Sequence, residues 1–402
     1  MNDKQLDRQY VENTYARQDL LLEYGQGARV WDADGKEYID LGSGIGVNAL
    51  GHADEGWLQA VTGQLKKLSH TSNLYYTAPC ARLAEALCTR TGMERVFFCN
   101  SGAEANECAI KAARKYSATH YGAGRHVIVA LQNSFHGRTM ATLSATGQDA
   151  FHRHFDPFLE GFRYAPANDL AGTLAALRGD VCALLFEPIQ GEGGVVELDY
   201  GYLQKLAAAC GEKDILLIAD EVQTGFGRTG KLFAMEHHSV QADLITMAKS
   251  LGGGFPISGV VGRADVMDGP AAGGLGGTYA GNPLAVAAAH AVLDVIAEEK
   301  LCERAVQLGD KLRARLEGLR AKVPGIADVR GLGSMVALEL NDANGKPDAE
   351  AVKKVQARAI AQGLILLSCG VYGNVLRFLY PLTIPDAQFD RALDILAESL
   401  AA

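Results

Sequence analysis

The sequence has no hydrophobic run long enough to cross a membrane. An apolar stretch without charge runs from Asn282 to Leu293 and ends at Asp294, whereas a membrane-spanning helix needs about 20 apolar residues. This alanine-rich stretch predicts a buried helix packed by small side chains. The first ten residues contain no apolar core of the kind found in secretory signals. We therefore expect a cytoplasmic protein with no membrane partner.

Paired cysteines are also absent. None of the eight cysteines forms a Cys-x-x-Cys pair, and their spacing is not that of a zinc site. Cys99, Cys108 and Cys182 lie in apolar patterns that predict reduced core residues. This usage favours a reducing compartment, and the sequence predicts no metal centre.

Positive charge is in deficit. The chain has 38 Lys and Arg against 47 Asp and Glu, which gives a net charge of −9. An acidic surface disfavours nucleic acid and anionic membranes as partners, while local cationic pockets for small acidic substrates stay compatible with it. With 402 residues, of which 48% are hydrophobic and 21% charged, the composition is that of a soluble enzyme with more than one lobe.

Short apolar runs alternate with helical patterns through the middle of the chain. Between residues 103 and 116, Ala105, Cys108, Ala109 and Ala112 recur on one face of a helix. Continuous apolar strands separated by helices predict an α/β fold with a mixed, mostly parallel sheet covered on both faces. The strands that we expect are 95–99, 126–130, 181–186, 215–219, 244–247 and 257–261.

The two ends of the chain differ from this middle part. Residues 30–40 predict a β-hairpin around an Asp34-Gly35 turn. Beyond residue 291, we expect amphipathic helices and short strands, with helices at 298–323, 349–362 and 389–400 and strands at 335–340 and 375–379. We therefore expect an N-terminal segment, 1–44, that belongs to a small domain, a large cofactor-binding domain, 45–290, and a smaller C-terminal α/β domain, 291–402.

Lys249 is the most informative residue of the chain. It follows the apolar run 244–247 and precedes three glycines, whose bare backbone lets a flat ligand lie close. Most lysines lie on the surface, but these neighbours argue against that position. The apolar run 215–219 ends in a second polar residue, Asp220. This pair suits pyridoxal 5'-phosphate, because Lys249 can form the Schiff base while Asp220 holds the proton on the pyridine nitrogen.

Other motifs supply groups that suit the same cofactor. Ser101, Gly102 and Ala103 begin a helix whose N-terminus would attract the phosphate, although Ser-Gly is also an ordinary helix cap. Phe135 is expected to stack on the ring, or else to be a plain core aromatic. His136 is expected to have a lesser, positioning role.

Two more segments complete the expected site. Val222 would pack on a ring face, and Gln223 would reach the phenolic oxygen. Glu187 and Glu192 lie in a glycine-rich segment that suits a loop built around a ligand, although both could be solvated loop residues.

Together these motifs resemble the class III, ω-amino-acid aminotransferases, a family of fold type I pyridoxal phosphate enzymes. The motifs occur in the family's order over residues 15–396, and the ordered set is more specific than any single motif. They are Asn100-Ser-Gly-Ala-Glu-Ala105, Phe135-His-Gly-Arg138, Glu187-Pro-Ile-Gln-Gly-Glu-Gly-Gly194, Asp220-Glu-Val-Gln223, Lys249 with its glycines, and Gly276-Gly-Thr-Tyr-Ala-Gly-Asn-Pro283.

The resemblance implies a homodimer with active sites at the subunit interface, where Thr278 reaches the cofactor phosphate of the other subunit. It further implies that Arg138 binds a substrate carboxylate. Arg377 would pair with Glu192 while an ω-amino donor is bound, and would bind the α-carboxylate of 2-oxoglutarate once released. A permanent Arg377–Glu192 pair is the alternative, and an aminomutase, a racemase or a binding protein without turnover are the alternative functions.

Within the family, the motifs divide between two kinds of amino donor. Tyr15 and Phe135 resemble the acetylornithine enzymes of arginine biosynthesis, and Ile45 replaces a tyrosine typical of ornithine enzymes. The C-terminal motifs resemble the 4-aminobutyrate enzymes instead, and Gly277 stands where acetylornithine enzymes usually have a serine. The sequence favours N-acetylornithine as the donor and 2-oxoglutarate as the acceptor, with 4-aminobutyrate or another ω-amino acid as the alternative.

Overall fold

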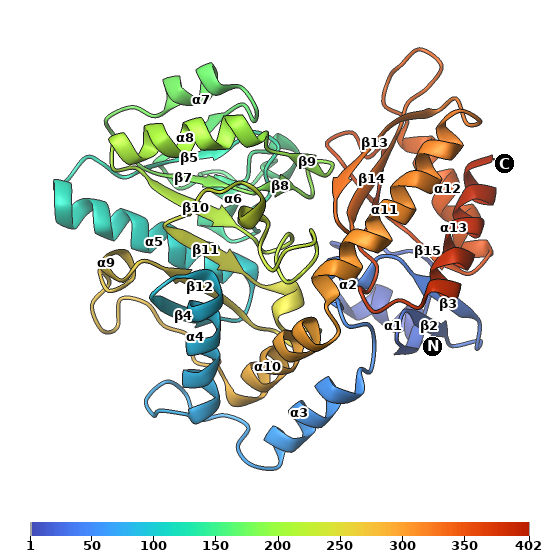
Figure 1. The fold of residues 1–402 in the computed structure, drawn as a ribbon, viewed down its shortest axis with the longest axis horizontal. Helices are drawn as coiled ribbons and strands as arrows, with labels where there is room; N and C mark the ends of the chain where they lie inside the picture. Colours follow the sequence, from blue (N-terminus) through green and yellow to red (C-terminus); the bar gives the residue numbers. More distant parts are fainter. Residues whose placement is uncertain (1, 402) are drawn as a thin grey trace.

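Seven strands form the central sheet of the larger lobe in this computed structural model, which describes residues 2–401 (Figure 1). Their order is β4–β12–β11–β10–β7–β5–β6, and only β12 runs against its neighbours. The expected mixed, mostly parallel sheet is thereby confirmed. The strands are β4 (Arg95–Cys99), β5 (Val127–Leu131), β6 (Phe162–Ala165), β7 (Val181–Phe186), β10 (Leu216–Asp220), β11 (Leu244–Met247) and β12 (Ser258–Gly262).

Helices cover both faces of this sheet. On one face, α5 (Gly102–Tyr121) packs the small side chains of Ala105, Ala109 and Ala112 against Ile218 and Val260 of the sheet. Small residues let the helix approach the strands closely, which agrees with the periodicity seen in the sequence. The opposite face is covered by α4 (Ala78–Thr91), α8 (Tyr200–Glu212) and α10 (Pro283–Glu298), with α7 (Leu170–Ala176) beside α8.

The carboxyl ends of the parallel strands meet at one edge of the sheet. In open α/β sheets, ligands bind at this edge, because loops with free backbone groups converge there. The segments that follow β4, β5, β7, β10 and β11 all begin at this edge, and β12 starts there because it runs in the opposite direction. The chemically interesting motifs of the sequence lie in these segments.

The smaller lobe combines the two ends of the chain. Its first sheet, β1–β2–β3–β15, joins the N-terminal hairpin to a strand from the C-terminal part, and β3 pairs with β15 in parallel. Its second sheet, β13–β14–β17–β16, is antiparallel. The strands are β1 (Leu22–Gln26), β2 (Arg29–Asp32), β3 (Glu37–Asp40), β13 (Ile326–Leu332), β14 (Met335–Leu340), β15 (Leu364–Ile365), β16 (Leu367–Cys369) and β17 (Val375–Phe378).

One apolar core holds the smaller lobe together. Ile39 and Leu41 from the N-terminal part pack with Leu338, Phe378 and Phe389 from the C-terminal part. The helices of this lobe are α11 (Leu301–Arg320), α12 (Ala349–Ala361) and α13 (Asp386–Ala401).

The remaining elements are short or lie at the edges of the lobes. They are α1 (Asp3–Tyr10), α2 (Ser43–Gly46), α3 (Glu55–Leu65), α6 (Met140–Ala145), β8 (Ile189–Gln190), β9 (Val196–Glu197) and α9 (Ala264–Met267). No helix within residues 2–401 is long and apolar enough to cross a membrane.

Several element limits differ from the sequence predictions. The strands expected at 95–99, 181–186, 244–247 and 335–340 are confirmed. The helix predicted at 298–323 is wrong at its start, because Lys300 adopts a left-handed conformation with φ 52° and separates α10 from α11. The helix expected at 282–293 runs on to Glu298, and so continues through residue 290, where the large domain was expected to end.

Candidate active site

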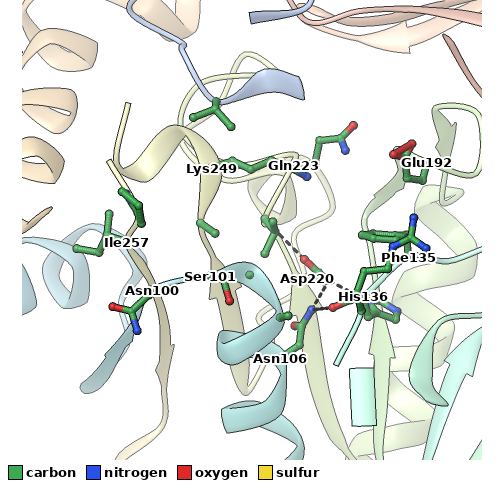
Figure 2. Close-up of a pocket in the computed structure, with 18 of the residues that line it drawn as sticks. Asn100, Ser101, Asn106, Phe135, His136, Glu192, Asp220, Gln223, Lys249 and Ile257 are labelled. Atoms are coloured by element: carbon green, nitrogen blue, oxygen red, sulfur yellow. Dashed lines mark hydrogen bonds and ion pairs between the residues drawn. The ribbon is translucent and has the colours of Figure 1, made fainter. Parts of the chain in front are cut away.

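A cavity of about 470 Å³ opens at the carboxyl edge of the central sheet (Figure 2). It is lined by segments from five strand ends and from the start of α5. A cavity at this edge with a few converging polar groups is the usual form of a small-molecule site. Among the residues expected to bind cofactor, those lining it are Ser101, Gly102, Ala103, Phe135, Glu187, Asp220, Val222, Gln223 and Lys249.

Lys249 begins a 3-10 turn, Lys249–Leu251, two residues after β11 ends. Its backbone is left-handed, with φ 45°, a conformation that costs energy in any residue with a Cβ. Lys249 is half-buried and lines the cavity. Burial, assisted by the positive charge of Arg377, lowers the pKa of Lys249. A larger fraction of the amine is therefore in its neutral, nucleophilic form than in an ordinary lysine at the same pH.

Asp220 ends β10, the strand next to β11, and its carboxylate is fixed by three donors. Oδ2 lies 2.8 Å from both His136 Nδ1 and Asn106 Nδ2, and Oδ1 accepts the N–H of Val222 at 3.1 Å. Figure 2 shows these side chains converging on the carboxylate from α5 and from the segment after β5. The carboxyl group of Asp220 is thus buried and held in a fixed orientation.

The N-terminus of α5 forms the next side of the cavity. Ser101 caps the helix through a bond from the N–H of Glu104 at 3.2 Å, so the N-cap interpretation of this motif is correct. The first N–H groups of a helix have no partner within it and attract anions. Gly102 is required on steric grounds, because a Cβ there would lie 2.9 Å from Val222 Cγ1.

Phe135 and Glu187 lie side by side at the ends of β5 and β7. The Oε1 of Glu187 accepts the backbone N–H of Phe135 at 2.8 Å, and its Oε2 accepts that of Gly191 at 3.1 Å. Burial raises the pKa of Glu187 to about 7. Glu187 is therefore no solvated loop residue, and its backbone bonds hold the two loops together.

The guanidinium of Arg138 lies over aromatic rings at the exposed mouth of the cavity. Its Cζ is 4.1 Å from the ring centroid of Phe151 and 5.5 Å from that of Phe135. No carboxylate pairs with Arg138 among the salt bridges of the described residues 2–401. Held by stacking, Arg138 can bind an anionic ligand.

Arg377 on β17 forms an ion pair with Glu192, which lines the cavity. Nη2 of Arg377 donates to Oε1 of Glu192 at 3.1 Å, and Nη1 lies 2.8 Å from Oε2. The arginine side chain is buried, while that of Glu192 keeps 27% of its surface exposed. The pair joins the smaller lobe to the wall of the cavity.

Five residues expected at the site do not line this cavity: Arg377, which is joined to it through Glu192, and four that lie elsewhere. Tyr15 is exposed near α1 and lines a different hollow. Ile45 is exposed on α2, two residues before Val47, which does line the cavity. Gly277 lines a second cavity of about 370 Å³, and Thr278, beside it, is exposed. A single chain does not bring these four to Lys249.

Two residues matter more than the sequence alone indicated. Asn106 was not expected at the site. It is a polar residue among the buried residues of α5, which include Ala105 and Cys108, and a buried amide of this kind indicates a polar partner. His136, given a lesser role, contacts Asp220 at 2.8 Å, the same distance as Asn106. Both residues act through that carboxylate, which sequence spacing does not reveal.

The residues present fit pyridoxal 5'-phosphate. The cavity combines an amine of lowered pKa, a fixed carboxylate and a helix N-terminus, which match the aldehyde, the ring nitrogen and the phosphate of the cofactor. Oε1 of Gln223 is buried without a hydrogen-bond partner, so this side chain can take part in binding the phenolic oxygen. No cluster of potential metal ligands occurs within residues 2–401.

Comparison with known proteins gives a consistent answer. Residues 10–400 match the family described as aminotransferase class-III. The chain is 48% identical over 399 residues to acetylornithine aminotransferase from Haemophilus ducreyi, covering 99% of this chain and 98% of that protein. It is 46% identical over 401 residues to the 5-aminovalerate aminotransferase DavT from Pseudomonas aeruginosa, covering 94% and 93%.

A solved structure extends the comparison to the fold. Ornithine aminotransferase from Toxoplasma gondii superposes with a TM-score of 0.93 at 36% identity, covering 99% of this chain and 94% of that one. A further structure of that enzyme is described as having partial occupancy of PLP at its active site. The chain therefore belongs to the class III aminotransferases, pyridoxal phosphate-dependent enzymes of fold type I.

Proposed function

We propose that this enzyme transfers the distal amino group of N-acetylornithine to 2-oxoglutarate, giving N-acetylglutamate 5-semialdehyde and glutamate. The observation that carries this proposal is the 48% identity to an acetylornithine aminotransferase across nearly the full length of both proteins. Acetylornithine aminotransferases of other organisms match at 41–43% identity over similar lengths. In the cell the reaction belongs to arginine biosynthesis, and we assign the enzyme to the cytoplasm.

The catalytic roles fall to Lys249 and Asp220. When bound, pyridoxal 5'-phosphate supplies an electron sink for the carbon that carries the reacting amine. Lys249 Nζ would hold the cofactor and, once displaced by the donor, would move the proton from that carbon. Asp220 would keep a proton on the pyridine nitrogen, and its three hydrogen bonds hold the carboxyl group in place for that role.

The other lining residues orient the cofactor. Ser101, Gly102 and Ala103 would hold its phosphate, Phe135 and Val222 would enclose its ring, and Gln223 would bond its phenolic oxygen, since all six line the cavity. Glu187 positions the loop that carries Phe135 through the bond to its backbone.

Two arginines bind the carboxylates of the substrates. Arg138 binds the carboxylate of the donor, helped by Tyr15, and then the distal carboxylate of 2-oxoglutarate. Arg377 pairs with Glu192 while the donor is bound, since the donor has no second carboxylate. It leaves Glu192 to bind the α-carboxylate of 2-oxoglutarate. The 2.8 Å ion pair supports the first of these two states.

The functional unit that we propose is a homodimer with its active sites at the interface. The segment 65–76 supports this, because it exposes Leu65, Leu68, Leu74, Tyr75 and Tyr76 on the surface of the single chain. Exposed apolar patches of this kind mark contact surfaces. In the dimer, Gly277 contacts the donor and Thr278 binds the cofactor phosphate, each in the active site of the partner.

A second candidate keeps the reaction and changes the donor. The 46% identity to a 5-aminovalerate aminotransferase favours a simple ω-amino acid, such as 5-aminovalerate or 4-aminobutyrate. Gly277, in place of a serine that would contact an acylated donor, favours it too. Under either candidate, Ile45 disfavours free ornithine as the donor, because it replaces a tyrosine typical of ornithine enzymes.

One assay separates the candidates. Glutamate formation is followed with N-acetylornithine, 4-aminobutyrate, 5-aminovalerate and ornithine as donors at equal 2-oxoglutarate. We expect the highest kcat/KM with N-acetylornithine, and a clear preference for a simple ω-amino acid would establish the second candidate instead.

A further inference from the structure

Four consecutive residues at the junction of the two lobes adopt a left-handed conformation. Ser43, Gly44, Ile45 and Gly46 have φ values of 41°, 65°, 64° and 72°, and together form the short helix α2, which lies between the lobes in Figure 1. Left-handed residues normally occur singly, because their Cβ meets the following carbonyl oxygen. Two of these four carry a Cβ, so surrounding structure must hold the turn in place.

The smaller lobe grips this turn next to Arg377. The hydroxyl of Ser43 donates to the carbonyl oxygen of Leu379, and the N–H of Leu379 donates to the carbonyl of Leu41 at 2.9 Å. Leu379 stands two residues after Arg377, directly beyond β17. The carboxylate of Asp40 adds bonds from the N–H groups of Gly42 and Ser43 at 2.8 and 3.0 Å.

The larger lobe grips the same turn next to Lys249. The hydroxyl of Ser250 donates to the carbonyl oxygen of Gly46 at 2.7 Å, and both residues are buried. Ser250 directly follows Lys249 within the 3-10 turn. One residue beyond the left-handed turn, Val47 lines the cavity.

We propose that the left-handed turn Ser43–Gly46 is a positioning device, which sets the separation between Lys249 and Arg377. The inference rests on the proposed function, in which Arg377 binds the α-carboxylate of 2-oxoglutarate. The carbon that receives the amino group is bonded to that carboxylate, so its distance from Lys249 Nζ follows from the separation of the two residues. Arg138, which binds the donor carboxylate, is not among the residues bonded to the turn.

The turn should therefore matter more for the acceptor than for the donor. A shift of the turn moves Arg377 relative to Lys249 and misplaces the keto acid, while the donor stays anchored at Arg138. Misplacement of a reacting group by as little as 1 Å can slow a reaction by about 100-fold. A residue with a merely structural role would affect both half-reactions equally.

Gly46→Ala tests the turn without a steric clash. The new Cβ would lie 3.5 Å from the nearest atom, Leu379 Cδ1, which is ordinary contact, so the effect comes from the left-handed backbone alone. Gly35→Ala is the matched control: Gly35 has φ 80°, a Cβ there would meet nothing within 4 Å, and it lies in the β2–β3 hairpin. Ser250→Ala removes the hydrogen bond from Ser250 to the carbonyl of Gly46. It is the variant to measure if Gly46→Ala fails to fold.

Each half-reaction is measured separately in the loaded enzyme, by single-turnover absorbance with N-acetylornithine or with 2-oxoglutarate. For Gly46→Ala and Ser250→Ala, we expect kcat/KM of the acceptor half-reaction to fall about ten-fold and that of the donor half-reaction to stay within about two-fold. Gly35→Ala should leave both unchanged. Equal losses in both half-reactions, or no loss in either, would overturn the proposal.

A second measurement needs no cofactor and no turnover. The N–H of Gly252 donates to the carbonyl of Lys249 at 3.1 Å, and that of Leu251 to Ala248 at 3.0 Å. In cofactor-free protein, amide hydrogen exchange at these two residues should speed up in Gly46→Ala and Ser250→Ala but not in Gly35→Ala. Unchanged exchange contradicts the grip on Lys249. If the wild type transfers no amino group to 2-oxoglutarate, the proposed function is wrong. The exchange measurement then still tests whether the turn Ser43–Gly46 holds the segment around Lys249 in place.

Discussion

His136 holds Asp220 through a bond of 2.8 Å between its Nδ1 and the Oδ2 of the carboxylate, and both side chains are buried. Because a carboxylate oxygen accepts, Nδ1 carries the hydrogen of this bond, while Nε2 is buried without a hydrogen-bond partner. The histidine and Asn106 thus occupy Oδ2, while Oδ1 accepts the N–H of Val222 at 3.1 Å. The geometry leads to predictions for this carboxylate and for the buried groups around it.

Asp220→Asn should slow transamination by roughly 100-fold or more, because a neutral amide cannot hold a proton on the ring nitrogen. The initial rate of glutamate formation at saturating donor and cofactor measures the effect. Glu221→Gln is the matched control, since Glu221 is the adjacent carboxylate and does not line the cavity. An Asp220→Asn enzyme within about ten-fold of the wild type would remove Asp220 from its assigned role.

Lys249→Met should stabilise the cofactor-free protein, and the gain should shrink as the pH rises. The folded-state pKa of Lys249 is lowered, mainly by burial. The unfolded state therefore binds the extra proton in the window below the ordinary value of 10.5, and wild-type stability rises with pH through it. Each tenfold change in proton affinity corresponds to about 1.4 kcal/mol.

Urea unfolding of both cofactor-free proteins at about pH 7.5 and about pH 9.5, both below the ordinary lysine pKa of 10.5, checks this expectation. A constant difference between the two pH values would mean that the Lys249 amine has an ordinary pKa.

Glu221→Gln should flatten the decline of stability between about pH 5 and pH 8. Burial raises the pKa of Glu221 to about 7 from 4.5, so its contribution is complete below pH 4.5 and is lost as the pH rises through 7. The relative gain of the variant over that range is about 3 kcal/mol. The bonds from the N–H groups of Ala234 and Met235 add a pH-independent offset. Parallel curves of unfolding free energy against pH for the two proteins would refute the raised pKa.

Glu192→Ala should slow the donor half-reaction by about ten-fold or more, because it leaves the buried guanidinium of Arg377 unpaired beside a donor with one carboxylate. The glutamate half-reaction should be unchanged or faster, since Arg377 is then free for the α-carboxylate. Glu192→Gln, which keeps the shape of the side chain without its charge, separates loss of charge from loss of packing. Equal effects on both half-reactions would instead support a permanent Arg377–Glu192 pair.

Much of the larger lobe could be predicted because its strands are continuously apolar. Leu244–Met247 and Val181–Phe186 have no polar residue except Thr246, and such runs are bounded by clear breaks. The polar residues that follow these strands could then be assigned to one edge of a sheet. This argument brought Lys249, Asp220, Glu187 and Ser101 together, and the cavity contains all four.

The remaining features depend on contacts that sequence spacing does not encode. Asn106 reaches Asp220 across 114 residues, and the left-handed turn is held by Leu379 and Ser250 from distant segments. The break between α10 and α11 occurs at the left-handed Lys300. Helix ends are usually marked by glycine or proline, and a lysine gives no such signal. Thr278 and Gly277 lie in a loop outside the cavity that contains Lys249, so the single chain does not test the role that the sequence suggested for them.

The pairing of β3 with β15 has a consequence for how the protein is made. Ile39 donates its N–H to the carbonyl of Gly363 at 2.8 Å, a residue synthesised 363 − 39 = 324 positions later. At roughly 5–20 residues per second on the ribosome, the emerging N-terminal hairpin waits on the order of tens of seconds for its partner strand. The lobe that carries Arg377 is therefore closed only near the end of translation, after the larger sheet has left the ribosome.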